Sequence, residues 1–344
     1  MQKACEENRR DIVDLMILNG CTDYNDGIMG ACKGGHVELV ELMLSLGAKN
    51  YNTGLVNACI GGHVAIINRM IELGANDFNN GLYYACNIHI AQLMIDLGAN
   101  AFKWSFENAC STGNMEIINL MISYGADNYN DGVRYACLKG HYEVVKLLFE
   151  LGFDEYDEEF LSACEGGNLE IVELFLSKGV IVTDESLYYS CLGGNIDVVK
   201  LVLSHGATDY DMGLIGACSI GHNALVNMML ELGAINYNGG LAAACASGNN
   251  AVVKMMLDLG ANNYEESFHM AVMAKHFEIA KLLFSKVTNK NISLPPFSSL
   301  EFKILVNSKD IDLSIKNEHP EYHLLNFYNI NIPDIDRLIN KYLF

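Results

Sequence analysis

Cysteine and histidine recur four residues apart in this sequence, and both are side chains that bind zinc. The pairs are Cys32/His36, Cys59/His63, Cys137/His141 and Cys218/His222. On one continuous helix, residues four apart lie on the same face, as the ligands of a metal must. Taken alone, this spacing is compatible with a metalloprotein or a metal-dependent hydrolase.

Two observations argue against a metal site. Glycines such as Gly61 and Gly62 stand between the members of each pair and interrupt a helix. In other copies of the pattern the histidine is replaced by asparagine, which has no comparable affinity for zinc: Asn114, Asn168, Asn195 and Asn249. Because His and Asn both form hydrogen bonds, we expect them to tie a turn or cap the next helix. We expect the thiols to be small packing groups, and we predict no metal, no cofactor and no catalytic residue.

The cysteines mark an internal repeat. Ten of them are Cys5, Cys32, Cys59, Cys86, Cys110, Cys137, Cys164, Cys191, Cys218 and Cys245. Each step is 27 residues, except the step of 24 from Cys86 to Cys110, and Ala precedes every one except Cys191. The register continues to Ala271-Val272 without the cysteine. A fixed period of this length predicts stacked supersecondary units rather than a globular catalytic domain.

Each repeat reads as two helices joined by a glycine turn. In residues 47–73, the stretch around Leu55, Ala58 and Cys59 predicts a short helix, which Gly61-Gly62-His63 ends. The second helix has apolar residues spaced i, i+3, i+4, i+7 on one face, namely Leu39, Leu42, Met43 and Leu46 in the preceding repeat. Glycine closes this helix. No segment of the repeats has the pattern of a strand.

The repeat resembles the ankyrin repeat. The residues that carry the likeness are Gly54-Leu55-Val56-Asn57-Ala58-Cys59 in the first helix, Gly62-His63 in the turn and Leu73-Gly74-Ala75 at the close. The resemblance implies an all-α, ankyrin-type solenoid of helix–turn–helix repeats. Ankyrin units have 33 residues, and the six missing here fall between Gly47 and Leu55, so the fingers are expected to be truncated. The resemblance to the ankyrin repeat also implies a non-enzymatic scaffold that binds another protein.

The likeness covers residues 1–286, as one partial repeat and ten repeats. The 24-residue repeat at 74–97 lacks the Gly-Gly-His turn, and we expect a distorted, weak joint there. An aromatic residue recurs once per short loop and is expected to pack between repeats: Tyr24, Tyr51, Phe78, Phe102, Tyr129, Tyr156, Tyr210, Tyr237 and Tyr264. Thr183 interrupts this ladder and predicts a second weak joint.

Residues 287–344 depart from the repeat and are predicted to be a C-terminal cap or extension. The segment Ile292-Ser293-Leu294-Pro295-Pro296 resembles the opening of an F-box-like motif. One alternative is therefore a substrate adaptor of a ubiquitin ligase. A degenerate paralogue without a partner is another. The shortened repeats, rich in Asn, Tyr and Ile, are similar in style to giant-virus (mimivirus-like) ankyrin repeat proteins, which implies a host or viral partner.

Charge and hydropathy narrow the class of partner. The formal net charge of −20 disfavours nucleic acid and anionic membrane surfaces. No apolar run approaches the roughly 18 residues of a membrane span, and the start has no apolar signal-peptide core. An odd number of cysteines, eleven, suits a reducing compartment. We expect a soluble, intracellular monomer, in the cytoplasm of an infected host cell if the viral resemblance holds.

The partner site is expected on the first helices. With the fingers shortened, the exposed positions should lie one before and one after each Ala-Cys pair. The candidate residues at or beside these positions are Tyr84, Tyr135, Leu138, Tyr188, Tyr189 and Leu192. Tyrosine offers a large rigid surface and a hydroxyl, and repeated apolar side chains suggest a binding strip. Repetition by duplication, without any contact, would leave the same pattern.

Overall fold

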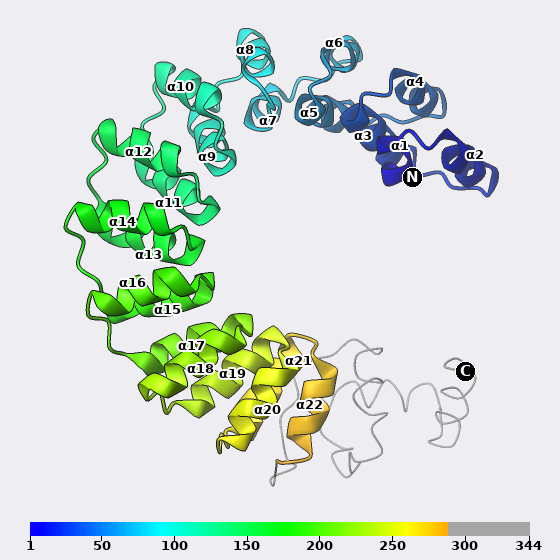
Figure 1. The fold of residues 1–344 in the computed structure, drawn as a ribbon. Helices are drawn as coiled ribbons and strands as arrows, with labels where there is room; N and C mark the ends of the chain where they lie inside the picture. Colours follow the sequence, from blue (N-terminus) through cyan, green and yellow to red (C-terminus); the bar gives the residue numbers. More distant parts are fainter. Residues whose placement is uncertain (288–344) are drawn as a thin grey trace, which may run out of the picture. The chain divides into compact units, whose positions relative to one another are not determined.

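Residues 1–287 of this protein are described by a computed structural model (Figure 1). Every regular element in that range is a helix, 22 in number, which confirms the predicted all-α fold of helix–turn–helix repeats. The chain forms two compact units, with their boundary between Ile181 and Val182. This boundary falls just before Thr183. Apart from Val287, the predicted cap or extension lies outside the described residues.

Unit 1 contains the partial repeat and six further helical pairs. Its first helices are α1 (Gln2–Glu6), α3 (Tyr24–Gly34), α5 (Tyr51–Gly61), α7 (Phe78–Tyr83), α9 (Phe102–Thr112), α11 (Tyr129–Lys139) and α13 (Tyr156–Gly166). Its second helices are α2 (Arg10–Leu18), α4 (Val37–Ser45), α6 (Val64–Glu72), α8 (Ile88–Asp96), α10 (Met115–Ser123), α12 (Tyr142–Glu150) and α14 (Leu169–Ser177). Successive first helices pack on one another from α1 to α13 and form one row of the unit, with the second helices in the other (Figure 1).

Unit 2 continues the same plan with four pairs. The first helices are α15 (Asp184–Gly193), α17 (Tyr210–Ile220), α19 (Tyr237–Ser247) and α21 (Tyr264–Met273). The second helices are α16 (Ile196–Ser204), α18 (Asn223–Leu232), α20 (Asn250–Asp258) and α22 (Phe277–Phe284). Here too, each first helix packs on the next.

The core lies between the two rows of helices. In the repeat at 47–73, Leu55, Ala58 and Cys59 of α5 are fully buried, together with Ile67 and Met70 of α6. Full burial of a leucine- or methionine-sized side chain contributes about 1.5–3 kcal/mol. Nine of the ten ladder cysteines are buried in the same way. The repeated apolar positions therefore predict the core correctly.

The turn between the two helices depends on glycine. Gly62 ends α5 with a φ of 85°, in the left-handed region that side chains disfavour. His63 follows directly and is the N-cap residue of α6. A β-carbon at Gly62 would also lie 3.1 Å from Cys86 Sγ. Both the backbone conformation and the close packing therefore favour glycine here.

A row of Asn and Asp side chains links the short loops of successive repeats. Asn52, the second residue of α5, accepts hydrogen bonds at Oδ1 from Asn76 N at 2.7 Å and Asp77 N at 3.2 Å, in the loop before α7. Five other residues at the same position of the repeat form the same pair of bonds, namely Asn25, Asn79, Asp184, Asp211 and Asn238. Six of the loops that lack fingers are thus held by side chain-to-backbone bonds.

The repeat at 74–97 is shortened in its first helix. Helix α7 has 6 residues, whereas α5 and α9 have 11. Cys86 follows α7 outside the helix and is exposed, unlike the other ladder cysteines, and its N–H donates to Cys59 O at 3.3 Å. The predicted distortion is present. That the joint is weak stays a prediction.

The aromatic ladder does not lie in the loops, as the sequence suggested. Each of its nine residues is the first residue of a first helix. The predicted placement in the loops was therefore wrong, because the residues begin the helices that follow those loops. The expected packing between repeats is present at Tyr129, whose ring centroid lies 6.0 Å from that of Phe106 in the preceding repeat. Where Thr183 interrupts the ladder, its N–H donates to Ser186 Oγ at 3.1 Å and it caps α15 instead.

Candidate functional site

The Cys/His spacing serves the joints between repeats. The imidazole Nε2 atoms of His36, His63 and His141 lie 3.0, 3.1 and 2.9 Å from backbone carbonyl oxygens of the preceding repeat. The equivalent Asn114 and Asn168 cap the next helix through Oδ1, as expected. Within residues 1–287, no three His, Cys, Asp or Glu side chains are grouped so that they could hold a metal ion.

The buried thiols are poor nucleophiles. Desolvation raises the pKa of Cys32, Cys59 and Cys164 to about 12. At neutral pH these side chains are therefore protonated, and a thiol is far less reactive than a thiolate. Their chemistry is that of small apolar packing groups.

The first helices leave one face uncovered. In α9 the buried residues are Ser105, Phe106, Ala109 and Cys110. The side of the helix opposite them carries Trp104, Glu107, Asn108 and Ser111, at spacing i, i+3, i+4, i+7. We call this side of each first helix the open face. It holds the positions from which a partner could be bound.

Three of the predicted residues lie on the open face of unit 1. Tyr84 and Tyr135 are exposed by 44% and 38%, and Leu138 is half-buried. The ring centroids of Tyr83 and Tyr84 lie 4.6 Å apart. Burial raises the pKa of Tyr83, and Tyr84, Tyr135 and Glu107 act in the same direction.

The other three predicted residues belong to unit 2. Tyr188, Tyr189 and Leu192 lie on α15 and are half-buried. The rings of Tyr188 and Tyr189 meet edge to face, with centroids 5.2 Å apart. Tyr188 and Tyr189 form a second aromatic pair, and Leu192 lies on the same helix.

The position before Ala-Cys is not exposed along the whole array. Gly30, Asn57 and Gly216 are buried there, which corrects the expectation of a uniformly open row. A β-carbon at Gly30 would lie 2.0 Å from Gln2 O, and one at Gly216 would lie 2.5 Å from Tyr188 O. Neighbouring first helices approach too closely at these points for a side chain. The position is therefore available only in some repeats.

Trp104 and Glu107 are functional candidates that the repeat pattern did not reveal. Trp104 is the only tryptophan in the chain and is 66% exposed on α9. Other repeats of unit 1 have polar residues at its position, among them Asp26, Asn80 and Asp131. Residues that recur in every repeat do not reveal a side chain that occurs in one repeat only. The presence of a single tryptophan in the chain nevertheless indicated a candidate binding residue.

Charged groups around Trp104 are unevenly neutralised. Arg134 forms an ion pair with Asp131, and its guanidinium lies over the Tyr135 ring, 5.9 Å from the centroid. Glu107 accepts a hydrogen bond from Asn128 Nδ2 at 2.7 Å. Burial, followed by the nearby Asp131 carboxylate, raises the pKa of Glu107. The negative charge of the Glu107 carboxylate is therefore less well neutralised by its neighbours than that of the Asp131 carboxylate.

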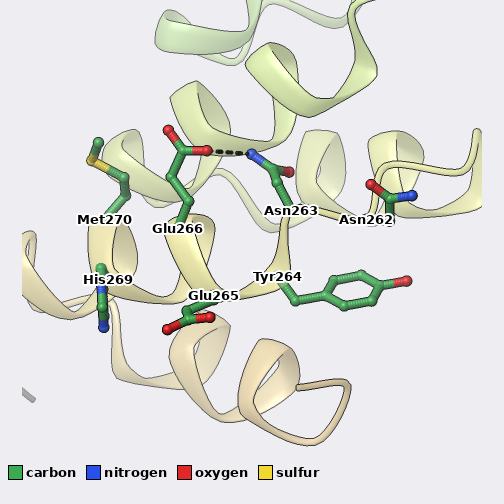
Figure 2. A pocket seen from close by; sticks show the side chains of 7 residues that line it. All are labelled: Asn262, Asn263, Tyr264, Glu265, Glu266, His269 and Met270. Carbon is green, nitrogen blue, oxygen red and sulfur yellow. Dashed lines mark hydrogen bonds between the residues drawn. The ribbon is translucent and has the colours of Figure 1, made fainter. Parts of the chain in front are cut away.

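A shallow depression lies at the start of α21 in unit 2 (Figure 2). It is lined by Asn262, Asn263, Tyr264, Glu265, Glu266, His269 and Met270. Asn263 Nδ2 donates to Glu266 Oε2 at 3.1 Å, the bond drawn in Figure 2. In that view Tyr264 and His269 point away from this pair, so these side chains do not converge on one point where a substrate could react.

Comparisons with known proteins find a structural similarity but show neither a family nor a function. No protein-family model matches the chain, and no curated protein matches it. Among solved structures, the human ASB11 ankyrin repeat domain is similar at 20% sequence identity, over 58% of this chain and 96% of that one, with a TM-score of 0.36. A similarity at this TM-score carries no argument about this chain. Within residues 1–287, no helix is both long and apolar enough to cross a membrane.

Proposed function

We propose that this protein is a non-enzymatic scaffold that binds another protein through the open face of its first helices. The observation that carries the proposal is the exposure of Tyr84, directly after α7, of Trp104 on α9 and of Tyr135 on α11, three successive first helices. Tyrosine and tryptophan dominate the energetics of protein interfaces. Exposed together on one face, they support a binding surface rather than a site for chemistry.

Its shortened ankyrin-like repeats resemble those of giant-virus proteins, and on that likeness the partner is a host or viral protein met inside the cell. The binding unit is a single copy of the chain, since the open face requires no second copy to complete it. The charge of −20 makes nucleic acid an unfavourable partner.

The test is capture of partners from a lysate of the cells in which the chain is made. A Tyr84→Ala/Tyr135→Ala variant is compared with wild type and with Val64→Ser, which alters an exposed residue on a second helix. The proposal expects a specific partner that the double variant loses and Val64→Ser keeps. Equal retention by both variants would place binding elsewhere. Absence of any specific partner would favour a degenerate paralogue.

The adaptor alternative depends on residues 287–344, nearly all of which lie outside the described range. Truncation after Lys286 separates the two functions. A plain scaffold keeps its partners after truncation, whereas an adaptor loses the subunits of a ubiquitin ligase while keeping its substrate.

A further inference from the structure

We group five exposed or half-buried residues on and beside the first helices α7, α9 and α11 as the aromatic–acidic patch of unit 1: Tyr83, Tyr84, Trp104, Glu107 and Tyr135. The patch is held together across repeats, because Asn108 Nδ2 donates to Tyr83 O at 2.7 Å and joins α9 to the end of α7. Trp104 lies one helical turn before Glu107, on the same side of α9. The patch coincides with the shortened repeat, whose early helix end leaves Tyr84 exposed.

Glu107 is the acidic centre of this patch. It is half-buried, and within residues 1–287 no lysine or arginine forms an ion pair with it. The one nearby guanidinium, Arg134, is engaged by Asp131 and Tyr135. Asn128 supplies a neutral donor only. A carboxylate in this setting gains from an added cation, since charge-assisted hydrogen bonds are stronger than neutral ones.

The aromatic rings add a second attraction for the same kind of group. Cations are attracted to the faces of tryptophan and tyrosine rings, and the stems of Lys and Arg pack on aromatic surface. The chain itself shows this chemistry at the edge of the patch, where Arg134 pairs with Asp131 and lies over the ring of the patch residue Tyr135. The net charge of −20 would also accelerate the approach of a cationic partner.

We propose that the aromatic–acidic patch binds a lysine or arginine side chain on an exposed basic segment of the partner protein. The carboxylate of Glu107 accepts its hydrogen bonds, and Trp104 and Tyr84 contact its stem and charge. This proposal rests on the proposed function, since it specifies what the open face of unit 1 recognises. It selects against partners whose contacting segment is acidic.

The solitary tryptophan lies in the patch and so reports binding directly. The experiment titrates the full chain with acetylated, amidated pentaarginine at physiological ionic strength and follows Trp104 emission. The expected result is a saturable change in the emission of Trp104. The Glu107→Gln substitution should raise the Kd for the peptide about tenfold. Glu116→Gln is the matched control, because Glu116 is an exposed carboxylate on the second helix α10 of the same repeat, away from the open face. It should alter the Kd less than about twofold, as expected for an exposed, screened charge.

Equal weakening by both variants would overturn the proposal, because it would show attraction to net charge alone. So would the absence of any saturable change. A Glu107→Asp variant, which keeps the charge, should bind more tightly than Glu107→Gln, and circular dichroism verifies that each variant is folded. If a captured partner is lost with Trp104→Ala but kept with Glu107→Gln, the scaffold function stands and cation recognition falls.

Discussion

Cys86 differs from the other ladder cysteines in the exposure of its side chain. Nine ladder cysteines are buried, and the eleventh cysteine, Cys21, is half-buried. Reaction with a maleimide requires access and the thiolate form. Burial raises the pKa of Cys59 to about 12 and also raises the pKa of Cys86, so the difference in reactivity between these thiols depends first on access.

We therefore predict that a water-soluble maleimide modifies Cys86 first in the native protein, Cys21 more slowly, and the remaining nine only after unfolding. Mass spectrometry of labelled peptides gives the order of reaction. Cys86→Ser should remove the fastest phase without exposing other sites. Rapid modification of Cys59 in the native protein would contradict the buried ladder.

Glu159 lies in a slot that other repeats fill with Gly or Ser. It is 5% exposed, and burial raises its pKa, with Glu158 and Glu155 acting in the same direction. The folded state therefore holds the proton more tightly than the unfolded state. Stability is lost as the pH rises from the unfolded pKa through the folded pKa.

Glu159→Gln removes this penalty. We predict that it increases the free energy of unfolding at pH 7 by about 1 kcal/mol, a size typical of a single buried substitution. The gain should disappear at a pH below the unfolded pKa, where Glu159 is protonated in both states. Urea denaturation at the two pH values measures it. The exposed neighbour is the control, and an equal gain from Glu158→Gln would mean that general charge repulsion is responsible.

At the scale of elements, the loops depend on the Asn and Asp row. Asn52→Ala removes both bonds to the loop before α7. Because these bonds lie at the surface, we expect a loss of about 1 kcal/mol from the free energy of unfolding. Asn68→Ala, at an exposed position in α6, should cause no loss, since alanine favours helix. Equal unfolding midpoints in urea for Asn52→Ala and wild type would show that the row is not stabilising.

The elements were largely predictable from the sequence because their cause is local and repeated. The spacing of Leu39, Leu42, Met43 and Leu46 requires a helix with one buried face, and Gly62 requires a turn. The contacts between repeats were not predictable in this way. That His63 reaches Lys33 O depends on the distance between stacked helices, which no spacing within one repeat encodes.

The candidate site was only partly predictable, for a related reason. Tyr84 and Tyr135 are at a recurring position, and exposure confirms that a partner could reach them. The same position is closed at Gly30 because the neighbouring backbone is too near. Glu107 acts on Tyr83 across a repeat boundary, where Asn108 also donates to Tyr83 O, and these relations exist only once the helices are stacked.

At the scale of the whole molecule, a repeat protein is stabilised by interfaces between neighbours rather than by one central core. The interface that α7 can form is limited by its 6 residues, since both flanking first helices have 11. The repeat at 74–97 should therefore be the least protected interior part of unit 1. We predict faster amide hydrogen exchange in α7 and α8 than in α5 and α6.

Restoring the missing turn tests whether the deletion is the cause. Inserting Ile-Gly-Gly between Cys86 and Asn87 recreates the 27-residue period and allows α7 to extend. Exchange in α7 and α8 should then slow about tenfold, equal to about 1.4 kcal/mol of local stability. The reciprocal deletion of residues 60–62 should create a second weak joint, at α5. If exchange is already uniform across unit 1, and insertion leaves it unchanged, the short helix is fully compensated by packing and the joint is as strong as its neighbours.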